Sequence, residues 1–384
     1  MSKNLAYVNN KILVLARNFN NFTIEDVSKH MNVKNDKIIE WESGLKYPTI
    51  KQAMKLAKFY RFAFAVFYLH TPPEEKNRIK QVDYRKDLKK NNEVFSRELK
   101  WFIEDIQDRR DLMIEIFNQE KKEIFILTDF FNESSDISSI ALFIRNFLGI
   151  DYNSQKNKNN EKEFLNYLID NLEKKQFLIF NAVKVQSSEM RGLSLSYETF
   201  PIIGLNQKDT VHARIFTLIH ELTHVLLRKS SVCNDMNVKD NKSIESFCNN
   251  VAGLTLVDSY DLLNHNIILK NKNIELDDLS IFSKNFKVSK EVILYRLKEL
   301  NLIDKNKYLE YNLIIKNQYN DSKNSVSSEK FLPEVVDKLS QLGIFYTRSI
   351  FEAYENGIFT LRDVSNNLLN LKIKNFSTMQ KRIY

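Results

Sequence analysis

The five residues HELTH, at positions 220–224, carry the side chains whose types and spacing most clearly suggest chemistry. His220 and His224 stand four residues apart, so on a helix their imidazoles lie on one face, one turn apart. This spacing lets both rings bind one zinc ion, while Glu221 can accept a proton from a water that the metal activates. The competing interpretation is a pair of hydrogen-bonded histidines in a protein core.

The segment 211–227 is the predicted helix that positions these side chains. It contains no Pro or Gly, and its apolar residues recur at helical spacing, so we expect this helix to be largely buried. Polar side chains are costly to bury without partners. A metal ion would supply the partner that two histidines and a glutamate need there.

A third ligand has to come from another element, because a catalytic zinc usually takes three protein ligands and keeps one position for water. The segment 243–257 is predicted to form a second buried helix, and Glu245 is an acid in its first turn. Glu245 is therefore a candidate third ligand. From the residues alone, a solvated carboxylate that favours the helix dipole is an equal alternative.

The residues around these positions resemble the ImmA/IrrE family of zinc metallopeptidases. The string FTLIHELTH, followed by E-x-x-C-N-x-x-A at 245–252, is similar to the family pattern FTLxHELxH with E-x-x-A-N-x-F-A. Upstream, RGLSL at 191–195 and PIIGLN at 201–206 resemble the pair of strands that precedes the zinc helix of the family. The resemblance extends, more loosely, over residues 120–300.

The resemblance implies a gluzincin-like peptidase with Zn²⁺ as its cofactor. His220, His224 and Glu245 are the implied zinc ligands, and Glu221 is the implied general base. Cys248 stands where the family usually has Ala, which is a small change on a packing face.

The composition predicts a mainly helical protein with a small β-sheet. Glycine is scarce, with 7 among 384 residues, and helix formers are common. Short strands are predicted at 177–183, 193–197 and 201–206. The predicted parts are a five-helix helix-turn-helix domain (1–70), a linker and long helix (71–123), a zincin-like α+β metallopeptidase domain (124–318) and a helical C-terminal domain (319–384).

The N-terminal region is basic. Residues 1–70 contain 11 Lys or Arg against 5 Asp or Glu, a net charge of +6 out of +8 for the chain, which points to a polyanion partner. The string 23–49 predicts two short helices joined by a tight turn. It resembles the Cro/repressor-like (XRE-type) helix-turn-helix family, whose pattern ends I-x-x-W-E-x-G-x-x-x-P. Double-stranded DNA is the partner that this resemblance implies.

The exposed face of the predicted third helix offers the candidate DNA contacts. Lys34, Asn35 and Lys37 lie on that face, and Lys46 follows the helix as a candidate phosphate contact. Acids on the same face, such as Glu40, would approach phosphates unfavourably. The alternative is a helix-turn-helix that docks a protein, either the substrate or another copy of this chain.

The remaining features bear on location and assembly. Two cysteines are too few for a disulfide scaffold, no signal peptide is visible, and the longest apolar run, 62–69, is too short to span a bilayer. We therefore expect a cytoplasmic protein without a membrane partner. The amphipathic segment 91–123 is predicted to be one long helix, whose charged face is either solvated or part of a homodimer.

Two further expectations concern how a substrate binds. We expect the strand at 191–197 to lie at a sheet edge beside the zinc helix and to pair with an extended peptide. Arg191, Tyr197 and His212 are candidates for stabilising the oxyanion, by proximity in sequence only.

These observations predict a zinc-dependent endopeptidase that is also a transcriptional regulator. By resemblance, it would cleave a helix-turn-helix repressor and so derepress stress-response or mobile-element genes. One alternative is a DNA-binding regulator whose zinc domain senses or binds without proteolysis, although a purely structural site would not need Glu221. Another alternative is a toxin–antitoxin or phage-defence component that uses the same fold, and nothing in the sequence separates its biology from that of the repressor-cleaving peptidase.

Overall fold

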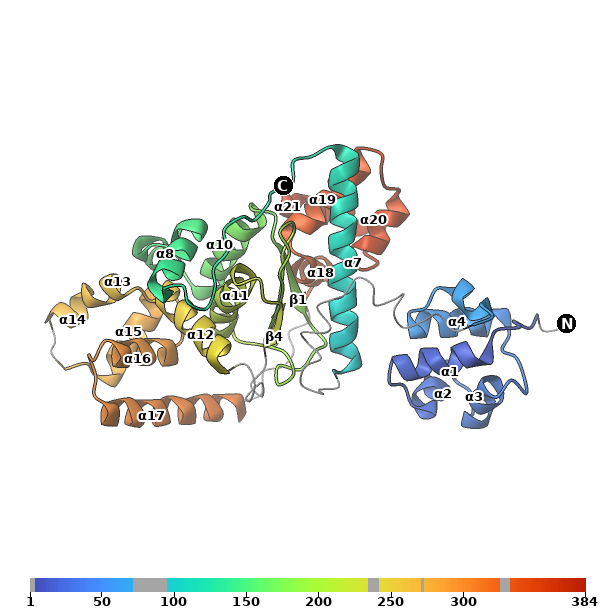
Figure 1. Ribbon diagram of the computed structural model, residues 1–384, viewed down its shortest axis with the longest axis horizontal. Helices are drawn as coiled ribbons and strands as arrows, with labels where there is room; N and C mark the ends of the chain where they lie inside the picture. The colour runs from blue at the N-terminus through green and yellow to red at the C-terminus, as the bar shows by residue number, and fades with distance from the viewer. Residues whose placement is uncertain (1–3, 72–94, 234–241, 271–272, 325–331) are drawn as a thin grey trace. The chain divides into compact units, whose positions relative to one another are not determined.

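The structure is a computed structural model of the chain, and it describes residues 4–71, 95–233, 242–270, 273–324 and 332–384. The chain forms two compact units, Met1–Lys90 and Asn91–Tyr384. The described residues are mainly helical, with one four-stranded mixed sheet (Figure 1). This confirms the predicted mainly α fold with a small sheet, while the finer four-part division stays a prediction.

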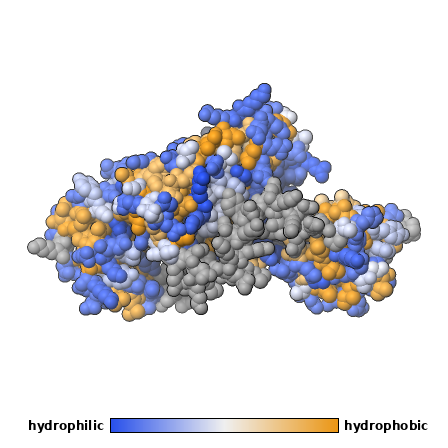
Figure 2. All heavy atoms as spheres, in the orientation of Figure 1, coloured by the Kyte–Doolittle hydropathy of each residue, from blue (hydrophilic) through white to orange (hydrophobic). Residues whose placement is uncertain are grey.

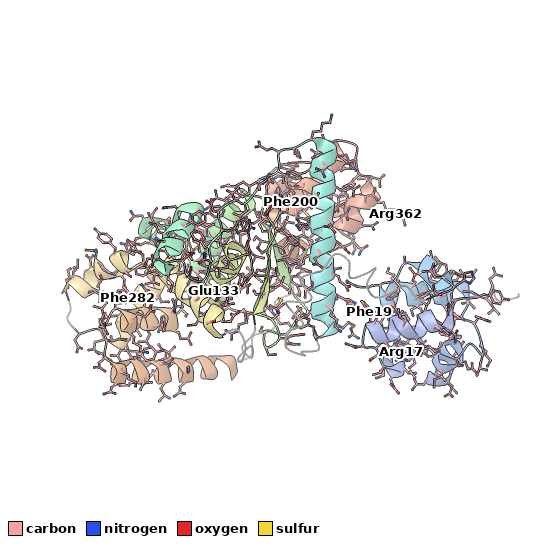
Figure 3. All side chains as sticks on the ribbon, in the orientation of Figure 1. Arg17, Phe19, Glu133, Phe200, Phe282 and Arg362 are labelled. Carbon is pink, nitrogen blue, oxygen red and sulfur yellow. The ribbon has the colours of Figure 1, made fainter. Side chains whose placement is uncertain are left out.

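The first unit is built from short helices with well-defined ends. Its described elements are α1 (Asn10–Phe19), α2 (Ile24–Met31), α3 (Asn35–Glu42), α4 (Ile50–Tyr60) and the 3₁₀-helix η1 (Phe64–Tyr68). Thr23 and Asp26 form a capping box at the start of α2, and α2 ends at Asn32, whose φ of 55° is left-handed. Arg17, which is labelled in Figure 3, connects α1 to α3 through an ion pair of 2.8 Å with Glu42.

The second unit contains the sheet. Its strands are β1 (Leu178–Ala182), β2 (Gly192–Leu195), β3 (Ile202–Asn206) and β4 (Ser231–Cys233), in the order β1-β3-β2-β4. β1 runs parallel to β3, whereas β2 is antiparallel to both β3 and β4. Three of these strands coincide with the predicted segments. The fourth has only three residues, which is too short for an alternating pattern to predict.

The strand order corrects the expected role of 191–197. β2 is an interior strand, because Leu193 pairs with Gly204 of β3 on one side and with Val232 of β4 on the other. From Gly192 to Ser194, neither edge of β2 is open for a substrate strand. The expectation failed because β4 could not be recognised in the sequence.

One face of the sheet is covered by α11 (Val211–Leu226), which packs on β2 and β3 (Figure 1). α12 (Lys242–Leu256) packs in turn on α11 and α8, and apolar side chains from this layer form one continuous core. The other helices of this side are α8 (Ile137–Leu148), α9 (Tyr152–Lys156), α10 (Glu161–Glu173), α13 (Ser259–Leu263), α14 (Asn266–Lys270), α15 (Leu276–Phe286), α16 (Lys290–Glu299) and α17 (Lys305–Asn324).

The other face is covered by α7 (Arg97–Glu120) and by the C-terminal helices. These are α18 (Glu334–Leu342), α19 (Ile344–Glu355), α20 (Leu361–Asn367), the 3₁₀-helix η2 (Ile373–Asn375) and α21 (Phe376–Ile383). Phe200 lies between the sheet and these helices, with its ring 5.0 Å from Phe117 of α7 and 6.3 Å from Phe345 of α19 (Figure 3). The sheet is therefore the middle of three layers. The boundary predicted at residue 319 falls inside α17.

The surface of each unit mixes polar and apolar residues. On the face drawn in Figure 2, orange apolar residues are interspersed with blue polar ones. Each helix among the described residues is either too short or too polar to span a lipid bilayer.

Candidate metal centre

The helix α11 carries the HELTH residues into the interior of the second unit. Thr210 caps its N-terminus by accepting a hydrogen bond from the backbone of Ala213, and every residue from Thr217 to Leu226 is buried. His220 is 5% exposed, His224 2% and Glu221 0%. The predicted buried helix is therefore present, and its polar side chains are enclosed.

The side chains of His220, His224 and Glu245 converge on one point. The two Nε2 atoms lie 3.1 Å apart, and Glu245 places Oε2 at 3.1 Å from His220 Nε2 and Oε1 at 3.4 Å from His224 Nε2. Donors of a tetrahedral zinc ion, at about 2.0–2.2 Å from the metal, lie roughly 3.3 Å apart. Two imidazole nitrogens and one carboxylate at these separations fit a metal ion.

The electrostatics of the three side chains favour a positive charge between them. Burial alone would raise the pKa of Glu245, but hydrogen bonds with His220 and His224 lower it well below its usual value. Burial would lower the pKa of His220, yet the hydrogen bond to Glu245 and the nearby charge of Glu221 raise it. The raised pKa of His220 means that the site favours a positive charge, here a proton on the imidazole. A metal ion bound between the three side chains would supply a positive charge in its place.

Glu221 contacts the sheet through the short strand β4. Its Oε2 accepts a hydrogen bond of 2.7 Å from the hydroxyl of Ser231, while Oε1 is buried and has no hydrogen-bond partner among the described residues. The Ser231 Oγ lies 2.9 Å from the Oγ of Ser194. Neither serine was among the predicted site residues. The alternation G-L-S-L-S at 192–196 signals a strand with small residues on one face and could have indicated Ser194, whereas Ser231 has no comparable signal in the sequence.

A cleft of about 740 Å³ opens beside Glu245. Its walls come from the N-terminal half of α11, from α12 and from the start of α16, with the lining residues Arg191, Asp209, Thr210, His212, Ala213, Phe216, Thr217, Glu245, Ser246, Asn249, Asn250, Gly253, Ser289, Glu291, Val292 and Tyr295. Two of the three oxyanion candidates, Arg191 and His212, therefore face the same cleft as Glu245. The third candidate, Tyr197, does not line the cleft. The guanidinium carbon of Arg110 lies 3.6 Å from the centroid of the Tyr197 ring.

Residues 180–298 match the family model Peptidase_M78, the IrrE N-terminal-like domain. The match supports the resemblance to ImmA/IrrE proteins and a peptidase function for this part of the chain. The M78 segment contains α11 and α12 and therefore all four residues predicted for the site. It covers less than half of the chain. No curated protein and no solved structure matches the chain.

The candidate DNA contacts lie outside the M78 segment, in the first unit. Lys34 and Asn35 are exposed at the start of α3. The ammonium of Lys37 lies 5.7 Å from the ring centroid of Trp41. Lys46 forms an ion pair of 2.7 Å with Glu40, so this acid on the α3 face is matched by a base.

Proposed function

We propose that this chain is a zinc-dependent endopeptidase that cleaves a helix-turn-helix repressor and thereby regulates transcription. The observation that carries the proposal is the convergence of His220, His224 and Glu245 beside Glu221 within the M78 segment. Cleavage of the repressor would release stress-response or mobile-element genes.

The chain's own residues divide the chemistry between them. Zinc held by the two histidines and Glu245 would polarise the scissile carbonyl and the attacking water. Glu221 accepts the proton of that water on its unpaired Oε1 and returns it to the leaving amine. Arg191 and His212 remain the candidate donors to the oxyanion, since both line the cleft beside Glu245.

The cleft is the place that we propose for the substrate. β2 is paired on both sides, so an extended peptide would not add to its edge. The cleft offers Phe216 and Val292 as apolar contacts and Asn249 as a polar one, next to the carboxylate of Glu245. A peptide side chain beside the scissile bond would enter there.

The first unit is proposed to bind double-stranded DNA. Its excess of basic residues, and the exposed Lys34 and Asn35 at the start of α3, support this partner. The ion pair between Lys46 and Glu40 reduces the repulsion expected between this acid and phosphates. Binding to DNA would keep the enzyme near a repressor on its operator and raise their effective concentration in the cytoplasm.

One observation favours a second candidate function, that of a DNA-binding regulator whose metal site does not hydrolyse peptides. Glu221 is 0% exposed and is not part of the cleft wall. A general base has to reach water in the reacting complex. A metal site that senses a signal or stabilises the fold would not need access of water to Glu221.

The experiment compares wild type with Glu221→Gln for zinc content and for cleavage of the repressor encoded nearest the gene, with and without DNA. We expect zinc in both proteins and cleavage by wild type alone. Zinc in both proteins without cleavage by either would favour the regulator. Absence of zinc from wild type would remove the basis of both functions.

A further inference from the structure

We propose, on the basis of the peptidase function above, that Ser231 is the positioning residue for the general base Glu221. The Ser231 hydroxyl holds one oxygen of the carboxylate and leaves the other free for the attacking water. Ser194 orients this hydroxyl from the neighbouring strand. The two serines and Glu221 are distinct from the candidate metal ligands.

The positions of the two serines follow from strand pairing. Ser194 of β2 and Ser231 of β4 are direct partners in the antiparallel register, so their side chains project from the same face of the sheet. That face is the one on which α11 packs. The pair therefore meets the helix at Glu221, and Ser231 reaches its Oε2 at 2.7 Å.

The direction of the hydrogen bonds follows from the chemistry of the groups. The hydroxyl of Ser231 donates to Oε2 of Glu221, so its single proton is used in that hydrogen bond. The contact of 2.9 Å between the serine hydroxyls then has Ser194 as donor and Ser231 as acceptor. The two hydroxyls thus form a chain with one orientation, which ends on Oε2 of the carboxylate.

The carboxylate of Glu221 is packed closely against the backbone of β2. Gly192 lies on the same face of β2 as Ser194, and a Cβ on it would stand 2.4 Å from Glu221 Oε1 and 2.4 Å from Thr217 Cγ2. The glycine leaves room for Oε1, and Ser231 fixes the other oxygen. A free oxygen held in one place by packing and one hydrogen bond is the arrangement that a general base requires.

The test uses Ser231→Ala, Ser231→Thr and Glu221→Gln, with Ser230→Ala as the matched control. Ser230 is the adjacent serine, and its hydroxyl accepts a hydrogen bond of 3.0 Å from the backbone of Ser196 instead of contacting Glu221. Zinc content and thermal unfolding establish that each variant is folded and loaded. Two functional readouts follow, so that the result does not depend on one substrate.

The first readout is the separate measurement of kcat and KM for cleavage of the repressor by the zinc protein. We expect Ser231→Ala to lower kcat by about 10–100-fold, the range seen when a partner behind a reacting group is lost, and to leave KM within about twofold. Ser231→Thr keeps the hydroxyl and should restore most of kcat. Ser230→Ala should behave like wild type.

The second readout is the affinity of acetohydroxamate for the cobalt-substituted protein, followed by cobalt absorption. The hydroxamate hydroxyl needs a nearby carboxylate oxygen as acceptor, so Glu221→Gln and Ser231→Ala should both weaken binding, and Ser231→Thr should not. Equal affinity of Ser231→Ala and Ser230→Ala would overturn the role of Ser231. Equal affinity of wild type and Glu221→Gln would overturn the placement of Glu221 itself.

The outcomes separate this inference from the proposed function. If Ser231→Ala cleaves the repressor with the same kcat as wild type, the positioning role is refuted and the peptidase function stands. A second outcome is that wild type does not cleave the repressor, while its affinity for acetohydroxamate is still weakened by Glu221→Gln and by Ser231→Ala. That outcome refutes the repressor as substrate and supports the positioning role.

Discussion

Glu245 Oε2 lies 3.1 Å from His220 Nε2, although the two residues come from different helices and are 25 positions apart. This contact makes the carboxylate part of a buried donor set. The sequence alone left Glu245 equally well explained as a solvated acid in the first turn of a helix. The packing of α12 on α11 brings it to the histidines instead.

Replacement of Glu245 should separate metal binding from folding. We expect Glu245→Ala to weaken zinc binding by more than the roughly 10–100-fold that follows loss of an outer-shell partner, because a direct ligand is removed. Competition titration with a chelating dye measures the affinity. Ser246→Ala, at the next position of α12, is the control. Unchanged zinc affinity in Glu245→Ala would contradict the assigned ligand set.

Gly192 should be intolerant of a methyl group. A Cβ there would stand 2.4 Å from both Glu221 Oε1 and Thr217 Cγ2, so Gly192→Ala should destabilise the fold by about 1–3 kcal/mol through overpacking. Urea unfolding gives the free energy. Gly253 is the contrasting glycine, because the nearest atom to its added Cβ, Arg296 Cδ, is at 3.6 Å and it lies within α12.

Gly253→Ala should therefore stabilise the protein by roughly 0.5–1 kcal/mol, the ordinary gain in a helix interior. If both substitutions change the free energy of unfolding equally, β2 and α11 do not pack as closely at Gly192 as the structure shows.

The carboxylate of Glu173 should make stability depend on pH. It lies at the end of α10 and accepts hydrogen bonds from the backbone N–H of Ile344, at 3.0 Å, and of Phe345, at 3.2 Å, at the start of α19. Burial opposes these bonds and raises the pKa of Glu173 to about 7. In the unfolded chain the same group titrates near its ordinary value of about 4.3.

Between these two pKa values the native state binds the proton and the unfolded state does not, so stability falls as pH rises from about 4 to 7. We expect this group to reduce the free energy of unfolding by roughly 2–3 kcal/mol between pH 5 and pH 8. Glu173→Gln should lack that contribution. Urea unfolding of both proteins at the two pH values tests it, and parallel pH profiles would contradict the raised pKa.

The basic residues at the start of α3 should contribute to DNA affinity through phosphates. The double variant Lys34→Ala, Lys37→Ala should bind duplex DNA more weakly at every sequence, and the slope of log K against log salt should fall by about 2. The control is Lys305→Ala, Lys316→Ala, which removes the same charge from exposed positions of α17. A salt slope that falls equally in both would show non-specific attraction and favour a protein partner for the first unit.

Much of the site could be predicted because its signals are local. The spacing of His220, Glu221 and His224 acts through the period of a single helix, and the apolar pattern around them indicates burial directly. Capping residues such as Thr23 likewise mark a helix start within four residues. The positions of α11 and α12 and three of the four strands followed from such short-range patterns, and the mainly helical class followed from composition.

The tertiary structure decided what depends on contacts between distant segments. β4 is recognisable only through its pairing with β2, and that pairing closed the edge assigned to the substrate and brought Ser231 to Glu221. Glu173 caps a helix 171 residues away. A three-residue strand or a buried carboxylate has no periodic signature of its own, because the hydrogen bonds that stabilise it come from residues that only folding brings close.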